Sequence, residues 1–187
     1  LDAESRRLRA AAFHAARRAM CLSPVIAHAN YLLNLASPVE RTRTMSIDVL
    51  ADELTRCEAL GVEGLVLHPG SHLRDECRMA NSEWRMTEGE VAGIEAIALG
   101  LDELHRRCAG FRSMILLETT AGQGTNLGWR FEHLRGMLDR VADPDRVGIC
   151  LDTCHLFAAG YDLRTPESYA ATIDDLERVI GLARVRC

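Results

Sequence analysis

Four short apolar segments of the chain each end on, or run directly into, a side chain that can bind a metal ion. These side chains are His28, His68, Glu118 and Asp152. Imidazole nitrogens together with carboxylate oxygens suit Zn²⁺, Mn²⁺ or Fe²⁺ better than Mg²⁺ alone. Ions in such sites polarise an ester or a phosphate and lower the pKa of water. The four segment ends therefore predict a metal-dependent hydrolase or isomerase.

The two histidines support each other as ligands. Pro69 follows His68 and disfavours a helical conformation for it, so His68 is expected at the extended end of a strand. A single histidine in such a place is more often a hydrogen-bonded core or loop residue, and only the pair with His28 favours metal ligands. His72 lies further into the loop, where we expect it to contact a ligand side chain or the substrate.

Glu118 is the predicted catalytic residue. It closes the apolar run 114–117, and a buried carboxylate there is costly unless it is paired or binds a cation. An ion pair with an arginine is the alternative. The next residues, 119–126, are small and uncharged and leave room for a ligand to approach the backbone. A carboxylate in this position can bridge two cations.

Asp152 and His155 form the fourth group of candidates. They stand three residues apart in the segment 150–155, a spacing that lets them reach different ions of one cluster. Cys150 and Cys154 also suggest a zinc–thiolate site, but one pair with this spacing is weak evidence. We expect both cysteines to be reduced packing residues.

Stretches with helical periodicity separate these segments, and strand–helix alternation predicts a parallel sheet. Ligands gather beyond the carboxyl ends of such strands, and in a (β/α) barrel that face carries the active site. Helices are expected over 2–20, from about 45 to 61, from 87 to 110, after 128 and from 165 onward. Long loops are expected over 29–44 and 69–86. The last helix is expected to bury the apolar stripe Tyr169, Ile173, Leu176 and Ile180.

The predicted fold class is α/β, an incomplete TIM (β/α) barrel in one domain over 1–187. An eight-unit barrel takes about 250 residues, and the 187 residues supply four to five of the eight strand–helix units. The chain begins without methionine inside an expected helix, and 183–187 resembles the start of a strand. We therefore expect a fragment that lacks the N-terminal and C-terminal parts of the barrel.

Composition narrows the class of protein further. Hydrophobic residues make up 48% and charged residues 26%, as in soluble globular proteins. No apolar run approaches the ~20 residues that cross a bilayer. Seven scattered cysteines favour a reducing compartment, so we expect a cytoplasmic protein. The net charge of -5 argues against a generally basic nucleic-acid binder, although bound cations count for more than the total.

Three segments resemble signatures of the endonuclease IV family, the apurinic/apyrimidinic (AP) endonuclease family 2. They are 67–73, 117–128 and 148–162. The resemblance implies a TIM barrel with three zinc ions. It also implies hydrolysis of the phosphodiester 5′ to an abasic site in double-stranded DNA, during base excision repair. The expected partner is thus damaged duplex DNA, the expected assembly is a monomer, and no membrane is involved.

The resemblance also assigns roles to the ligands. His28 and His68 resemble ligands of one zinc, and Glu118 resembles the carboxylate that bridges to a second zinc. Asp152 also matches a ligand of the second zinc, and His155 matches a ligand of the third. The family's remaining ligands lie beyond residue 187, so one complete zinc site is expected from this chain.

Tyr31 and Leu32 match a pair that enters the DNA at the lesion in this family. An aromatic ring followed by an aliphatic side chain in a loop also suits insertion between base steps. The alternative for Tyr31 is an exposed loop aromatic. Two other functions remain open: a xylose-isomerase-like sugar isomerase or epimerase, and a catalytically inactive truncated fragment.

Overall fold

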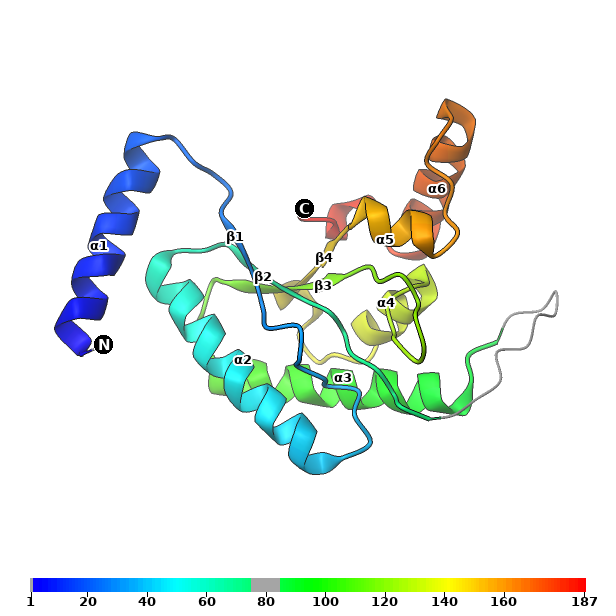
Figure 1. The fold of residues 1–187 in the computed structure, drawn as a ribbon, viewed down its shortest axis with the longest axis horizontal. Helices are drawn as coiled ribbons and strands as arrows, with labels where there is room; N and C mark the ends of the chain where they lie inside the picture. Colours follow the sequence, from blue (N-terminus) through cyan, green and yellow to red (C-terminus); the bar gives the residue numbers. More distant parts are fainter. Residues whose placement is uncertain (1, 75–84) are drawn as a thin grey trace.

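The computed structural model describes residues 2–74 and 85–187, and helices alternate with strands as far as residue 150 (Figure 1). The elements are α1 (Ala3–Ala19), β1 (Ile26–His28), α2 (Glu40–Leu60), β2 (Gly64–Leu67), α3 (Glu88–Arg107), β3 (Met114–Glu118), α4 (Phe131–Leu138), η1 (Pro144–Arg146), β4 (Val147–Cys150), α5 (Thr153–Ala158), α6 (Pro166–Val179) and η2 (Leu182–Arg184). The predicted α/β class is confirmed.

The strands form one parallel sheet in the order β1-β2-β3-β4, so each strand pairs with the one before it in sequence. Beyond β4, Val185 makes a parallel bridge to Ile149, and the amide of Arg186 donates to the Ile149 carbonyl at 2.9 Å. The expected strand start near the end of the chain is thereby confirmed. Parallel strands that pair in chain order and are joined by helical crossovers form the wall of a (β/α) barrel. The four described strands make part of such a wall and do not close into a barrel.

The helices cover one face of this wall. Helices α2, α3 and α4 lie side by side in chain order against the sheet (Figure 1). Leu65, Leu67, Ile115 and Leu117 share one core cluster with the apolar stripes of these helices. Because side chains alternate along a strand, every second residue points to the opposite face, toward the barrel interior.

Leu116 fills the interior face below the strand ends. A Cβ added at Gly64 would lie 2.5 Å from its Cδ1, and one added at Gly148 would lie 2.7 Å from its Cδ2. Gly148 of β4 pairs with Leu116, and Gly64 of β2 pairs with Met114, two residues earlier on β3. Glycines on the two neighbouring strands thus leave room for the Leu116 side chain, as large and small residues do in a barrel interior. Glu118 stands on the same face, two residues further along β3.

Two predicted helix starts and one predicted helix end are confirmed. Thr87 and Glu90 form a capping box at the start of α3, and Thr165 caps α6 ahead of Pro166. Gly61 ends α2 in the left-handed conformation at φ 63°, where a residue with a Cβ is strained.

The predicted loop over 29–44 is too long, because α2 already begins at Glu40. The amides of Thr42 and Arg43 both donate to the Val39 carbonyl and so start the helix earlier. The second predicted loop, 69–86, lies partly outside the described residues.

Two packing predictions are wrong. Tyr169 is 53% exposed, because the buried side of α6 runs through Thr172 and Leu176 and the helix projects from the body (Figure 1). Cys154 is exposed on α5, whereas Cys150 is partly buried on β4. The described cysteines are unpaired thiols.

Among the described residues, no helix combines the length and the apolar composition that crossing a membrane requires.

Candidate metal centre

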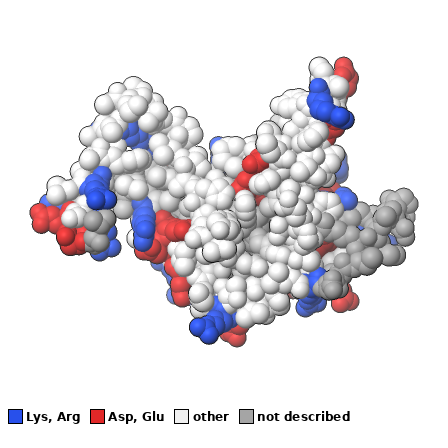
Figure 2. All heavy atoms as spheres, in the orientation of Figure 1, with Lys and Arg blue, Asp and Glu red and all other residues white. Residues whose placement is uncertain are grey.

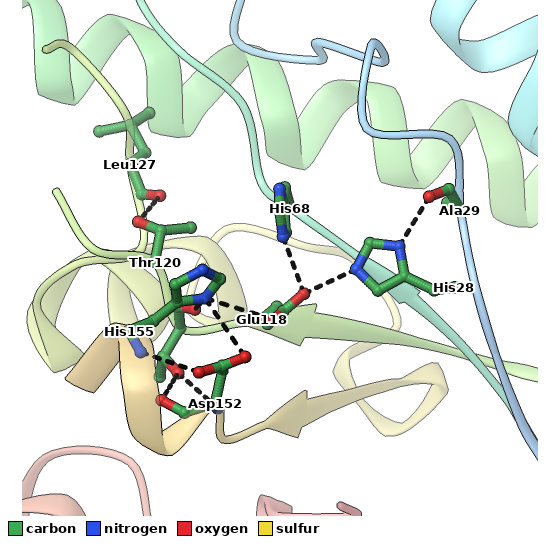
Figure 3. Close-up of polar contacts among 9 residues, drawn as sticks. His28, Ala29, His68, Glu118, Thr120, Leu127, Asp152 and His155 are labelled. Carbon is green, nitrogen blue, oxygen red and sulfur yellow. Dashed lines mark hydrogen bonds and ion pairs between the residues drawn. The ribbon is translucent and has the colours of Figure 1, made fainter. Parts of the chain in front are cut away.

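The strand ends bring the five predicted metal ligands to one place (Figure 3). His28 ends β1, His68 follows β2, Glu118 ends β3, and Asp152 and His155 lie where β4 leads into α5. Among the described residues they form two groups, His28–His68–Glu118 and Glu118–Asp152–His155. Within each group the candidate ligand atoms lie within 4.8 Å of one another. Glu118 belongs to both groups.

Strand register explains why these side chains meet. His28 pairs with the residue two positions before His68, and Glu118 pairs with the residue two positions before Asp152. A step of two along a strand returns a side chain to the same face. All four therefore point into the barrel interior above the floor that Leu116 makes.

The Glu118 carboxylate is the centre of the cluster and is only 5% exposed. Its Oε2 lies 2.8 Å from His28 Nε2 and 3.0 Å from His68 Nε2, and its Oε1 lies 3.3 Å from His155 Nδ1. Burial by itself would raise the pKa of Glu118, but hydrogen bonds and charge from His68 and His28 outweigh it and lower the pKa. One oxygen of an ionised carboxylate thus faces each group.

His28 tests whether a metal ion fits this site. Its Nδ1 lies 2.7 Å from the Ala29 carbonyl, which only accepts, so Nδ1 carries the hydrogen. In the neutral ring Nε2 is then an acceptor that faces a carboxylate acceptor at 2.8 Å. Two acceptors at this distance repel unless a proton or a cation lies between them. Zinc bonds of 2.0–2.2 Å place tetrahedral ligand atoms about 3.3 Å apart, so a shift of a few tenths of an ångström accommodates the ion.

His68 completes the first group. Its pKa is raised by the hydrogen bond and the charge of Glu118, against the opposing effect of burial. The His28 and His68 rings meet edge to face with centroids 5.1 Å apart. Without a cation, protonated imidazole satisfies Glu118. A cation in the same position would replace that proton.

The second group is held by Thr119. Its hydroxyl accepts from the Asp152 amide at 2.9 Å, and its carbonyl lies 2.9 Å from His155 Nδ1. Asp152 Oδ1 also caps α5 through the His155 amide at 2.8 Å. When Nδ1 donates to the carbonyl, the neutral His155 ring presents Nε2, the nitrogen farther from Glu118, as its metal-binding atom. This geometry favours the prediction that Asp152 and His155 serve different ions.

The sequence did not single out Thr119 or Ala29, although their carbonyls orient His155 and His28. Every residue has a backbone carbonyl, so the residue type carries no signal for this role. The Thr119 hydroxyl could have been noticed only through its place directly after Glu118.

A cavity of about 570 Å³ lies beside the cluster. His68 and His155 line it together with the Tyr31–Leu32 pair and the loop that contains Gln123. The Tyr31 and Leu32 side chains are 77% and 71% exposed at its rim. The structure thus brings the predicted DNA-contacting pair to the cavity of the predicted metal ligands.

His72 lies elsewhere. It is buried and lines a separate cavity of about 550 Å³ with Arg43 of α2 and Gly93 of α3. Its amide donates to the Thr125 carbonyl at 3.2 Å, so its backbone supports the loop above the strands. Its predicted contact with ligands or substrate stays a prediction.

Charge is distributed around the rim of the molecule. Figure 2 shows blue and red side chains interleaved along the edges of this face, with mostly uncharged surface between them. The formal net charge is -5. On this face, attraction for a phosphate backbone would have to come from local groups or bound cations rather than from a broad basic surface.

The chain is similar in sequence to a family of known fold. The profile of the family described as "Xylose isomerase-like TIM barrel" matches residues 2–186. A protein of Chloroflexus aggregans named "Probable endonuclease 4" is 46% identical over 177 residues, covering 95% of this chain and 57% of the relative. The chain thus spans somewhat more than half the length of that relative.

Solved structures show the same fold. Endonuclease IV from Thermus thermophilus superimposes with a TM-score of 0.73 at 36% identity, covering 94% of this chain and 56% of that one. A D-tagatose 3-epimerase-like protein superimposes with a TM-score of 0.69 over the whole of this chain and 62% of the other. At 21% identity the second likeness concerns the fold alone.

Proposed function

The chain belongs to the xylose isomerase-like TIM barrel family, and the resemblance to endonuclease IV is borne out. From this premise we propose that the protein is a zinc-dependent AP endonuclease of the deoxyribonuclease IV type. It would hydrolyse the phosphodiester 5′ to an abasic site in duplex DNA, in base excision repair. We also propose that 1–187 is a single partial TIM-barrel domain, and that the protein acts as a monomer in the cytoplasm, nucleoid-associated if bacterial.

One observation carries the proposal. A buried carboxylate, Glu118, stands between two pairs of metal-binding side chains, and the same cavity is rimmed by the exposed pair Tyr31–Leu32. The metal-binding side chains alone would suit a sugar isomerase as well, so it is the exposed aromatic–aliphatic pair that favours the nuclease. Insertion into a base stack uses such a pair directly.

In this proposal one set of side chains binds cations and another set contacts DNA. His28, His68 and Glu118 would hold one zinc, and Glu118 with Asp152 would contribute to a second. His155 Nε2 would serve a third. Bound zinc supplies Lewis acidity toward the phosphate oxygens and the attacking water; Mn²⁺ or Fe²⁺ would suit the same donors.

Recognition of damage falls to Tyr31 and Leu32 in this proposal. Where a base is missing, the stack has a gap, and filling it with an aromatic and an aliphatic side chain costs less unstacking than at an intact step. The wedge would hold the abasic nucleotide over the cavity, so that its 5′ phosphate lies near Glu118.

The test is a nicking assay on a duplex with one synthetic abasic site, alongside the undamaged duplex, with zinc-loaded protein. We expect cleavage 5′ to the abasic site only. Glu118→Gln should abolish nicking, because it weakens both groups at once. Tyr31→Ala should weaken binding to the abasic duplex while leaving zinc content unchanged.

Four results would overturn the proposal. Equal cleavage of both duplexes would remove damage specificity, and near-native turnover in Glu118→Gln would remove the bridging role. Turnover of a panel of ketoses without any nicking would favour the isomerase. Zinc well below one per chain in purified protein would instead favour an inactive fragment.

A further inference from the structure

The Tyr31–Leu32 pair forms the tip of a tight turn. The Leu33 amide donates to the Asn30 carbonyl at 3.2 Å, and the Leu32 amide donates to Asn30 Oδ1 at 2.9 Å. These contacts set the local shape of the turn. They do not determine where the turn lies relative to the cluster of predicted metal ligands.

Upstream, the turn is fixed to the sheet. The Ala29 amide donates to the Val66 carbonyl at 2.8 Å, and the Ala29 carbonyl accepts from His28 Nδ1 at 2.7 Å. The residue before the turn therefore also orients a predicted metal ligand. Movement of one would disturb the other.

Downstream, the side chain of Asn34 fixes the turn to a different loop. Its Oδ1 accepts from the amides of Ser71 at 2.9 Å and Ala36 at 3.0 Å. Its Nδ2 donates to the Ser71 carbonyl at 2.9 Å. One side chain thus joins the loop after β1 to the loop after β2, which begins at His68.

This contact leaves little space. A Cβ added at Gly70 would lie 2.5 Å from Asn34 Oδ1, and Gly70 itself has φ +123°, a conformation that L side chains rarely adopt. Glycine at this position lets the Asn34 side chain approach the backbone of the next loop closely.

The loop after β2 is fixed in turn to the loop after β3. Ser71 Oγ lies 2.5 Å from Thr125 Oγ1, and the Leu127 amide donates to the Gly70 carbonyl at 2.8 Å. The three loops that surround the cavity therefore form one hydrogen-bonded wall. Asn34 is the side chain through which the Tyr31–Leu32 turn joins it.

We infer that Asn34 is a positioning residue that holds the Tyr31–Leu32 turn in a fixed place beside the cluster of predicted metal ligands. This inference rests on the proposed function and explains how that function achieves damage recognition. A wedge that is already ordered loses less conformational entropy on binding, so preorganisation appears as affinity.

The chemistry of the contact calls for asparagine. The side chain must accept twice and donate once at the same place, and an amide has both an acceptor oxygen and a donor nitrogen. Alanine removes all three contacts. Aspartate keeps the acceptor oxygen but places a second acceptor against the Ser71 carbonyl.

The first test needs no DNA. In Asn34→Ala, native-state amide exchange at Leu32, Leu33 and Ala36 should be roughly tenfold faster or more, since the wall no longer holds the turn. Exchange of the β2 amides 65–67 should be unchanged. Asn34→Asp should fall between wild type and Asn34→Ala. Unchanged exchange in the turn of Asn34→Ala would overturn the inference.

The second test is a double-mutant cycle on binding to an abasic duplex. Asn34→Ala should bind roughly tenfold more weakly, with unchanged zinc content. Combined with Tyr31→Ala it should add almost nothing, because both changes remove the same wedge. Additive losses would show that Asn34 acts by another route and would overturn the inference.

Ser113→Ala is the matched control. Ser113 is buried just before β3, at the opposite end of the strand from Glu118, and its hydroxyl donates to the Val62 carbonyl at 2.7 Å. Its loss should lower stability without changing discrimination between abasic and intact duplexes. If wild type fails to discriminate, the proposed function falls, and the exchange measurement still decides the role of Asn34.

Discussion

The two ends of the parallel strands, which we call the carboxyl edge and the amino edge, differ in the groups that their carboxylates contact. At the carboxyl edge, Glu118 faces the ring nitrogens of three histidines. At the amino edge, Glu58 and Glu63 face donors. Both edges are built from the same strands, so the difference lies in what each carboxylate meets.

The amino edge is complete in itself. Glu58 Oε2 accepts from the amides of Arg112 at 2.8 Å and Ser113 at 2.9 Å. Glu63 accepts from the Val25 amide at 2.9 Å and forms an ion pair with Arg17 of α1. Burial opposes the charge on both carboxylates, but these hydrogen bonds outweigh it and lower the pKa of each.

The carboxyl edge requires a proton or a cation between His28 and Glu118. With Nδ1 of His28 donating to a carbonyl, the neutral ring and Glu118 present acceptor to acceptor. Only a proton or a cation completes that contact. In barrels of this kind the amino face serves stability and the carboxyl face serves function. Here the distinction is visible in single hydrogen bonds.

The largest expected effect is that of Glu118→Gln on zinc binding. The amide can donate to a histidine nitrogen, so the fold should be nearly as stable as wild type without metal. Zinc affinity should fall by at least roughly a hundredfold, because a charged ligand shared by both groups is lost. Competition against a chromophoric chelator measures the affinity, and urea unfolding measures the stability. Wild-type affinity in this variant would erase the contrast between the two edges.

The next effect is on the pH dependence of stability. The folded-state pKa of His68 is raised above 6.5, so its contribution is full below pH 6.5 and is lost as pH rises through that pKa. The folded-state pKa of Glu118 is lowered below 4.5, so its contribution is full above pH 4.5 and is lost as pH falls through that pKa.

Without metal, the pair should therefore stabilise the fold most between pH 4.5 and 6.5. Zinc needs neutral imidazole, so added zinc should stabilise increasingly as pH rises above this window. Thermal unfolding from pH 4 to 9, with zinc and with a chelator, measures both profiles. A zinc effect that is independent of pH would argue against histidine ligation.

A smaller effect is expected for Thr119→Val. The substitution keeps the carbonyl that orients His155 and removes the hydroxyl that holds the Asp152 amide. Residues that orient ligands typically contribute about tenfold or more to metal affinity. We expect about a tenfold loss in zinc titrations, confined to the ion that Asp152 would hold. A loss as large as that of Glu118→Gln would mean that the two groups are not separable.

The smallest effect on metal binding is expected at the amino edge, where Glu58→Gln matches Glu118→Gln in chemistry. It weakens two charge-assisted hydrogen bonds at a partly buried site and should cost about 1 kcal/mol of stability. Zinc affinity should be unchanged. If zinc binding also weakened, the two edges would be coupled through the strands rather than independent.

Much of the arrangement could be predicted from the sequence. The strand ends at His28, just before His68 and at Glu118, the capping box at Thr87 and the end of a helix at Gly61 all depend on local patterns. The prediction failed for the extent of the loop after β1 and for Tyr169. The loop is shorter than predicted because backbone hydrogen bonds to the Val39 carbonyl start α2 earlier. Tyr169 is exposed because α6 has limited contact with the body of the molecule.

The sequence by itself determined which residue types stand at the ends of the strands, because alternation along a strand is a local property. Only the tertiary structure decided which nitrogen of His28 faces Glu118, that His72 lies in a different cavity, and that Asn34 joins two loops. Those outcomes depend on backbone carbonyls and amides of distant segments. Every residue carries these groups, so no pattern of residue types can indicate which ones will meet.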